Sequence, residues 1–270
     1  MTELVANKLL LSLFTGGGLL DLGFELEGYC TVSAGDKLWG RDVRRFKPAR
    51  HIFEGIIGGS PCQDFSAARR TAPTGNGVEM LAQFARCVTE AGPDWFLLEN
   101  VPRVPDIIVP GYIVQRVNLN TKECGCAQNR LRCFQFGSLD GKTLVISRSE
   151  IYGAASPCCM ASEGKRGKRR TFADFCELQG LPRDFALPGL SQALKYQIVG
   201  NGVPVKMARV IAGSIKARQD TPFSRVCICN CGRPVRAGQT LATAACRKRM
   251  QRKRDAAASN IPGPVTPSLF

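Results

Sequence analysis

Short apolar runs alternate with helix-like stretches through the first half of the chain, and this alternation constrains the fold more than any other feature. The runs with the length and composition of buried strands lie at 9–14, 29–34, 53–57 and 94–98. Apolar residues recur every three or four positions over 19–27 and 78–90, which predicts helices between the strands. Because parallel strands need such crossovers, the sequence predicts an α/β fold with a mainly parallel sheet.

Three of the predicted strands are followed by residues that suit a ligand site. Gly16, Gly17 and Gly18 follow the first strand, Cys62 follows the third and Glu99 follows the fourth. Open α/β sheets bind ligands at the carboxyl ends of their strands, so we expect these residues to face one cleft. The glycine turn alone is weak evidence, because a tight strand-to-helix turn has the same composition. It resembles a dinucleotide fingerprint, yet Asp21 replaces the third glycine, which disfavours NAD and favours another adenosine-type cofactor.

Cysteine, carboxyl and guanidinium groups are predicted to meet at this edge. Cys62 follows a proline on a glycine-rich loop, which presents it to the cleft. Gln128, Arg130 and Arg132 lie on one face of a strand at a spacing of two. We expect the two arginines to hold a substrate anion and to lower the pKa of the Cys62 thiol from its reference of about 8.5.

Charge and residue usage narrow the class of partner. The 37 Lys and Arg residues exceed the 22 Asp and Glu residues, and the resulting net charge of +15 favours a polyanion such as nucleic acid. His51 is the only histidine, so a Ser-His-Asp triad or a His-rich metal centre is disfavoured. The N-terminal segment lacks a signal-peptide core and the apolar runs are too short to cross a membrane. We therefore expect a cytoplasmic protein whose 13 cysteines stay reduced.

Six sequence blocks occur in the order found in one enzyme family. They are Phe14-Thr15-Gly16-Gly17-Gly18, Pro61-Cys62-Gln63, Glu99-Asn100-Val101, Gln128-Asn129-Arg130-Leu131-Arg132, Leu178-Gln179-Gly180-Leu181-Pro182 and Gln197-Ile198-Val199-Gly200-Asn201-Gly202-Val203-Pro204. Along residues 8 to about 217 the chain thus resembles the DNA cytosine-C5 methyltransferase family. Ser60 and Thr15 depart from the residues usual at those positions, and neither departure alters the nucleophile.

The resemblance implies a Rossmann-like, S-adenosylmethionine-dependent fold and a defined set of catalytic roles. Cys62 would add to C6 of a cytosine flipped out of duplex DNA, and Glu99 would bind or protonate N3 and the exocyclic amine. Asn100 would hold the loop, Gln128 would brace its strand, and Arg132 and Arg130 would engage the base O2 and a nearby phosphate. The resemblance also implies transfer of a methyl group to C5.

The same resemblance places the cofactor on the glycine turn. Phe14, Gly16 and Gly18 would line its site, as would Asn201, which follows a late strand-like segment. Asp36 is a candidate for the ribose hydroxyls and Asp42 for the adenine amine, although either acid could bind the ribose and Asp36 could instead cap a turn. Trp39 could stack on adenine or pack against the sheet edge.

The remaining segments differ in composition from the core. We expect a catalytic core over 1–137 and 171–217, a small target-recognition insertion over 138–170 and a disordered C-terminus over 257–270. The basic run at 165–170 would contact phosphate, or it is a solvated loop. So small an insertion predicts few base-edge contacts and a short or relaxed recognition sequence.

The segment 218–256 is cysteine-rich and basic. Cys227, Cys229, Cys231 and Cys246 resemble a four-cysteine zinc unit, with free cysteines in a flexible arm as the alternative. Arginines and lysines at 247–249 and 252–254 would lie along DNA phosphates.

The sequence as a whole predicts a monomeric DNA cytosine-C5 methyltransferase that acts on double-stranded DNA. Two other interpretations stay open: an RNA cytosine-C5 methyltransferase, and a non-catalytic nucleic-acid-binding protein on the same scaffold.

Overall fold

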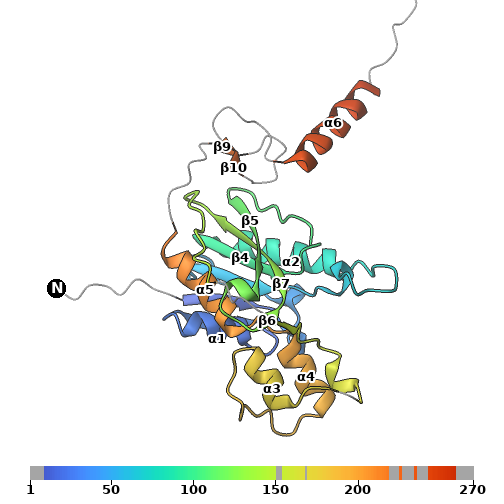
Figure 1. Cartoon of the computed structure of the whole chain (residues 1–270). Coiled ribbons are helices and arrows are strands. Elements are labelled where there is room, and N and C mark those ends of the chain that lie inside the picture. Colours follow the sequence, from blue (N-terminus) through green and yellow to red (C-terminus); the bar gives the residue numbers. More distant parts are fainter. Residues whose placement is uncertain are drawn as a thin grey trace, which may run out of the picture.

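A six-stranded sheet forms the centre of the protein (Figure 1). The computed structural model describes residues 9–149, 154–167, 169–218, 225–226, 234–235 and 243–259. The strand order is β2-β1-β3-β4-β7-β5, and β7 runs antiparallel to both of its neighbours while the other neighbouring strands run parallel. The strands are β1 (Leu9–Leu13), β2 (Cys30–Ala34), β3 (Gly55–Gly59), β4 (Trp95–Asn100), β5 (Ile113–Asn120) and β7 (Leu131–Ser138). The predicted α/β fold with a mainly parallel sheet is therefore confirmed.

Helices cover both faces of this sheet. On one face lie α1 (Leu19–Glu25) and α5 (Val205–Lys216), and on the other lies α2 (Asn76–Ala91). The two apolar layers are separate clusters, because alternate residues of each strand point to opposite faces. A Cβ atom added at Gly23 would lie 2.2 Å from the Cβ of Ala208, so glycine permits the close approach of α1 and α5.

A smaller lobe lies at one end of the sheet (Figure 1). It contains α3 (Phe172–Leu178) and α4 (Gln192–Asn201), and its core is a third cluster that includes Phe175, Tyr196 and Cys159. Cys159 comes from the predicted insertion, whereas Phe175 and Tyr196 come from the segment expected to return to the catalytic core. Residues on both sides of the expected boundary at 170 therefore share one core.

The strand expected immediately before Asn201 is wrong, because this segment is helix α4. Ser191 caps the helix by accepting a hydrogen bond from the Leu194 amide. The β-branched pair Ile198 and Val199 favours a strand locally, but Val199 is fully buried in the small-lobe core. Tertiary packing has overridden local propensity here.

Short elements connect these larger ones. They are the strands β6 (Gln128–Asn129) and β8 (Ser156–Pro157), which pair in parallel, and the 3-10 turns η1 (Lys37–Trp39), η2 (Val43–Arg45), η3 (Gln63–Phe65), η4 (Thr121–Glu123) and η5 (Glu163–Lys165). Within the described part of 138–170, the regular elements are limited to the end of β7, β8 and η5.

The tail contributes a two-stranded pair and one helix. The elements are β9 (Arg225–Val226), β10 (Pro234–Val235) and α6 (Ala244–Ser259). Cys246 lies in the first turn of α6, is buried, and has its Sγ 3.1 Å from the Thr243 hydroxyl. Cys227, Cys229 and Cys231, like residues 260–270, lie outside the described residues. Among the helices that the structure describes, none combines the length and apolar character that a membrane crossing requires.

Candidate active site

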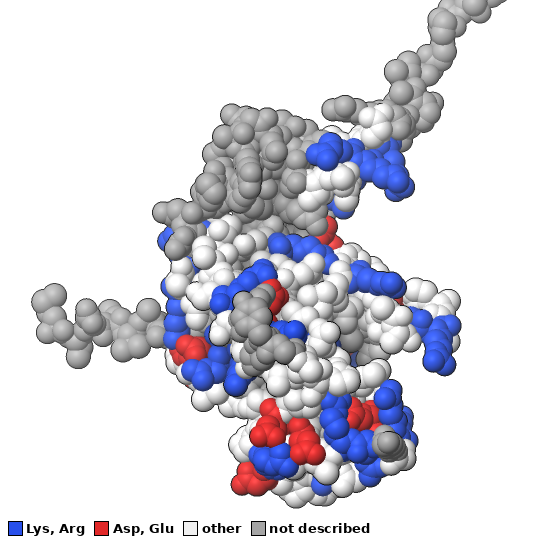
Figure 2. All heavy atoms as spheres, viewed as in Figure 1, with Lys and Arg blue, Asp and Glu red and all other residues white. Residues whose placement is uncertain are grey.

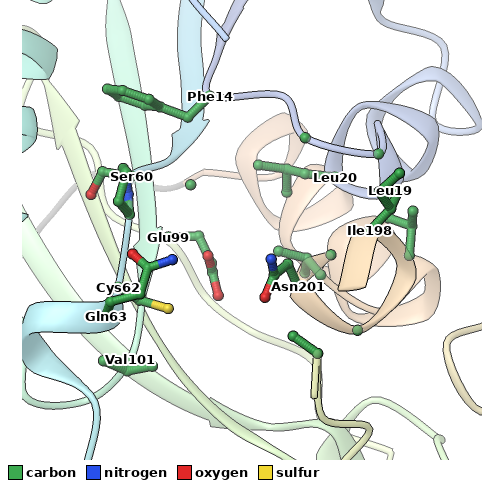
Figure 3. Close-up of a pocket in the computed structure, with 18 of the residues that line it drawn as sticks. Phe14, Leu19, Leu20, Ser60, Cys62, Gln63, Glu99, Val101, Ile198 and Asn201 are labelled. Carbon is green, nitrogen blue, oxygen red and sulfur yellow. The ribbon is translucent and has the colours of Figure 1, made fainter. Parts of the chain in front are cut away.

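The carboxyl ends of β1, β3 and β4 meet at one edge of the sheet and open into a cavity of about 940 Å³. Leu13 pairs with Gly58 and Gly59 pairs with Glu99, which aligns the three strand ends. Figure 3 shows the Cys62 sulfur and the Glu99 carboxylate pointing into the same space, with Asn201 facing them from α4. The expectation that Cys62 and Glu99 meet in one cleft with Gly16 and Gly17 is confirmed, whereas Gly18 is not among the residues that line the cavity.

A buried hydrogen-bond network fixes the loop that carries Cys62. Asn100, at the end of β4, donates from Nδ2 to the carbonyl of Ser60 at 3.0 Å and to its hydroxyl at 2.9 Å. Its Oδ1 accepts from the Val101 amide at 2.8 Å. Cys62 then caps the turn η3, in which the Phe65 amide donates to the Cys62 carbonyl at 3.0 Å. Asn100 thus ties the loop that carries Cys62 to the strand that carries Glu99.

Glu99 and Arg132 form an ion pair at the inner wall of the cavity. Arg132 Nε lies 3.1 Å from Glu99 Oε1, and the two side chains are 16% and 10% exposed. Glycine at position 59 makes room for this carboxylate, since a Cβ there would lie 3.1 Å from Glu99 Oε2. Burial raises the pKa of the Glu99 carboxyl, and the positive charges of Arg132 and Arg130 oppose that rise. A carboxyl group in this environment retains its proton more readily than one in water.

The expected lowering of the Cys62 pKa is wrong in direction. Burial raises the pKa of the Cys62 thiol, and the negative charge of Glu99 raises it further. The charges of Arg132 and Arg130 do lower it, as expected, but they do not outweigh burial and Glu99. The sequence indicated that the two arginines lie near the Cys62 thiol, but it did not show how far the thiol is buried.

Arg130 lines the cavity, but most of its donors are occupied by backbone. Its Nη1 donates to the carbonyls of Cys159 and Gly200, each at 3.0 Å, and its Nη2 donates to that of Gly202 at 3.0 Å. Arg130 is 2% exposed, and within the described part of the chain its Nε is buried without a partner. It joins the Cys159 segment to the turn after α4, whereas Arg132 faces Glu99.

Gln128 is fully buried and is not among the residues that line the cavity. Its amide donates to the Leu178 carbonyl at 2.9 Å and to Gln179 Oε1 at 3.0 Å, and its Oε1 accepts from the Cys159 amide at 2.8 Å. These contacts are those of a residue that braces its strand against the small lobe.

The opposite end of the cavity is built around the glycine turn. Phe14, Gly16 and Gly18 have positive φ values of 56°, 58° and 75°, which is unusual for a residue with a side chain such as Phe14. Asp36 accepts from the Gly16 amide and from the Leu38 amide, each at 2.7 Å. It therefore caps η1, as one of the two alternatives had it, and it also lines the cavity; binding of the ribose hydroxyls stays a prediction.

Asp42 and Asn201 also line the cavity. Asp42 caps η2 and lies 3.2 Å from Arg44 Nη1, and a backbone hydrogen bond from Arg44 is the main cause of the low pKa of Asp42. The side chain of Trp39 is not among those described.

The lining residues that were not predicted as part of the site include Asp21 and Cys158. Asp21 is buried and accepts from the Ser12 hydroxyl at 2.6 Å and from the Ser33 hydroxyl at 3.2 Å, which ties α1 to β1 and β2. Cys158 lies with its Sγ 3.5 Å from Arg130 Nη1. Asp21 was visible in the sequence as the residue replacing a glycine, whereas nothing local distinguished Cys158.

A family model and solved structures agree with this arrangement. A model of the C-5 cytosine-specific DNA methylase family matches residues 9–157 and 147–217. The chain belongs to this family. The DNA methylase fold is also that of a putative DNA modification methyltransferase encoded within an E. coli prophage, with a TM-score of 0.59 and 15% identity over 77% of this chain and 98% of that one.

Curated relatives of this methylase include type II methyltransferases. The type II methyltransferase M.HgiDI of Herpetosiphon aurantiacus is 28% identical over 78% of this chain and 95% of its own length. M.HindV of Haemophilus influenzae is 30% identical over 48% of this chain, and the match spans 53% of that relative. The chain thus spans about half the length of some relatives and nearly all of another.

Proposed function

We propose that this protein transfers a methyl group from S-adenosylmethionine to C5 of cytosine in duplex DNA. The observation that carries the proposal is the convergence of Cys62, Glu99 and Arg132 in one cavity with the glycine turn. A thiol, a carboxyl group that tends to hold its proton, and a guanidinium are the groups that a covalent attack on a pyrimidine requires.

The chain's own residues account for the activation of the ring. The Cys62 sulfur forms a bond to C6, and the thiol proton is lost before or during this addition. Glu99 supports the addition by giving its proton to N3 or sharing it there, which stabilises the charge that develops on the ring. Arg132 holds the Glu99 carboxyl in place. Its Nη1 donates to the Leu131 carbonyl at 2.7 Å, and its remaining N–H donors would engage the base O2. C5 then becomes nucleophilic and would form a bond to the donated methyl group. Loss of the C5 proton to a base, expulsion of Cys62 and return of the N3 proton to Glu99 then restore the aromatic ring.

The cavity also fits the methyl donor. S-adenosylmethionine, when bound, supplies an electrophilic methyl group on a sulfonium centre. Two acidic residues, Asp36 and Asp42, line the end of the cavity beside Gly16, and each carboxylate has acceptor positions beyond those used within the chain. Asp36 would accept from the ribose hydroxyls and Asp42 from the adenine amine.

A duplex that contains 5-fluorocytosine tests the proposal directly. Fluorine at C5 blocks the final elimination, so we expect the protein to be trapped covalently on the DNA when the methyl donor is present. Cys62→Ser should not be trapped and should still bind S-adenosylmethionine with nearly normal affinity. Retained methyl transfer by Cys62→Ser would refute the assignment of the nucleophile.

The nature of the substrate requires a separate competition. We propose duplex DNA because the chain carries excess positive charge, and Figure 2 shows Lys and Arg side chains spread over both the sheet and the small lobe. Part of the basic run is structural: Arg170 pairs with the buried Glu163, and its Nη1 donates to the Pro157 carbonyl at 3.0 Å. Preferential methylation of transfer RNA over duplex DNA would favour the RNA alternative.

We also propose that the tail binds zinc through Cys227, Cys229, Cys231 and Cys246. The burial of Cys246 at the start of α6 supports a structural role for this thiol. Elemental analysis should find about one zinc per chain, and Cys246→Ser should lower that ratio. We further propose a monomer acting in the cytoplasm, and light scattering of the purified protein tests its mass.

A further inference from the structure

Asp64 lies two residues after Cys62, and its carboxylate accepts hydrogen bonds from several donors. Its side chain, in the turn η3, is only 4% exposed. Oδ2 accepts from the Gly77 amide at 2.8 Å, and Oδ1 accepts from the Thr74 amide at 2.9 Å. Oδ1 also lies 2.8 Å from Arg69 Nη1, and the Thr74 hydroxyl contacts both oxygens. One carboxylate therefore contacts the middle of the loop and the start of α2.

Arg69 extends this network along the loop. Its Nε donates to the Thr71 carbonyl at 2.8 Å, and its Nη2 donates to the Ala72 carbonyl. The Arg69 side chain is 16% exposed, so the charge turns inward toward Asp64 instead of outward to a phosphate. Residues 64–77 are thus folded around one buried ion pair, which we call the Asp64 brace.

The Asp64 brace is joined to Cys62 through the turn η3. Asp64 is the second residue of η3, and Cys62 is the residue that caps this turn. A shift of Asp64 therefore rotates the turn that orients the Cys62 sulfur. The loop also forms one wall of the cavity through Ser66, Ala67 and Ala68. The brace holds the nucleophile and that wall in one arrangement.

We infer that Asp64 is a positioning residue for methyl transfer, holding Cys62 and the adjoining cavity wall in reactive geometry through Arg69, Thr74 and Gly77. The inference rests on the proposed function and adds to it a residue that touches neither substrate nor cofactor. Its charge matters because three N–H donors and a hydroxyl converge on it. An asparagine offers one oxygen acceptor and turns two donors of its own toward them.

Asp64→Asn is the central test, measured as a single turnover on a cytosine duplex. Misplacement of a reacting atom by about 1 Å can cost about 10²-fold in rate, so we expect a loss of that order. Affinity for S-adenosylmethionine, measured by calorimetry, should stay within about twofold of wild type, since Asp64 does not line the cofactor end. This division between rate and affinity would not arise from general destabilisation.

Matched variants separate positioning from folding. Thr74→Val removes the hydroxyl and keeps the shape, so we expect a drop of about two- to tenfold, while Thr74→Ser should behave as wild type. Asp174→Asn is a control: Asp174 also contacts a threonine hydroxyl and an arginine, at 2.6 and 2.7 Å, but lies outside the cavity lining. Asp174→Asn should leave the rate of methyl transfer unchanged. If Asp64→Asn does not fold, Thr74→Val still tests the positioning role.

A second readout does not depend on methyl transfer. Alkylation of Cys62 by iodoacetamide in the free protein, followed by peptide mass spectrometry, should be several-fold faster in Asp64→Asn, because release of η3 exposes the sulfur. Wild-type failure to methylate or to be trapped on 5-fluorocytosine would overturn the proposed function alone. Rates of methyl transfer and alkylation within twofold of wild type in Asp64→Asn would overturn the positioning role.

Discussion

Replacing Glu99 with glutamine should move two rates in opposite directions. The Glu99 side chain is 10% exposed and forms an ion pair with Arg132 Nε at 3.1 Å. Glutamine keeps the shape and an oxygen acceptor for Arg132, but it loses both the charge and the proton that Glu99 would share with N3. Removal of one preorganised group from a site that excludes water typically costs about 2.7–4 kcal/mol. We therefore expect methyl transfer to fall by about 10²- to 10³-fold.

The same substitution should make the Cys62 thiol easier to ionise. Burial is the first cause of the raised pKa of Cys62, and the charge of Glu99 is the second. Glutamine removes the second cause and leaves the first, so the pKa of Cys62 should fall toward its ordinary value. Thiolate is the species that iodoacetamide attacks. At pH values where Glu99 is ionised in the wild type, alkylation of Cys62 should therefore be faster in Glu99→Gln.

Both rates can be measured on one preparation. Tritiated methyl transfer under single-turnover conditions gives the first, and the pH profile of Cys62 alkylation, followed by peptide mass spectrometry, gives the second. Glu163→Gln is a suitable control, because Glu163 is a buried carboxylate paired with Arg170 that does not line the cavity. If Glu99→Gln lost methyl transfer while Cys62 alkylation stayed at the wild-type rate or slowed, the electrostatic coupling between Glu99 and Cys62 would be refuted.

Three further variants test other parts of the site. Arg132→Gln removes a charge that lowers the pKa of Cys62, so its alkylation profile should shift to higher pH; an unchanged profile would contradict the role of Arg132. Asp36→Ala removes the carboxylate that accepts a hydrogen bond from the Gly16 amide. Calorimetry should show the affinity for S-adenosylmethionine falling by about 10- to 100-fold. An unchanged affinity would mean that Asp36 only caps η1. Truncation after Arg218 removes the basic helix α6. The slope of log binding constant against log salt concentration should then become less steep by about 0.9 for each phosphate that the tail neutralises. An identical slope would exclude the tail from the DNA interface.

The sheet and the main site were predictable because both follow from one local pattern. Buried strands that end in a glycine turn, in Cys62 and in Glu99 must place those residues at one edge once the strands are parallel. Helix α4 was missed because its β-branched residues are stabilised by the small-lobe core, which assembles from distant segments. The direction of the Cys62 pKa was missed for a related reason: burial depends on everything that surrounds a side chain, and the charged residues that the sequence places at this edge are only part of those surroundings.

The roles of the two arginines illustrate the same limit. Spacing at 130 and 132 places both side chains on one face, but spacing cannot show which donors are already used. Arg130 has donors on Nη1 and Nη2 committed to backbone carbonyls from two segments far apart in sequence, whereas Arg132 meets a carboxylate in the cavity. The two arginines therefore differ in their contacts: Arg130 joins two walls of the cavity, and Arg132 lies against Glu99, where we propose that it acts in the reaction.

Burial has one consequence that links Cys62 and Glu99. It raises the pKa of both groups, so each holds its proton more firmly in the free protein than it would in water. For Glu99 this favours the reaction, because a proton is what N3 must receive as sulfur adds to C6. For Cys62 it opposes the reaction, because the thiolate is the nucleophile. Transfer of the Glu99 proton to the ring would leave a carboxylate beside Arg132, whose positive charge then balances it. Under the proposed mechanism, the positive charge of Arg132 would offset the negative charge that Glu99 acquires during the addition, so we expect Arg132 to contribute to the rate although Cys62 forms the bond.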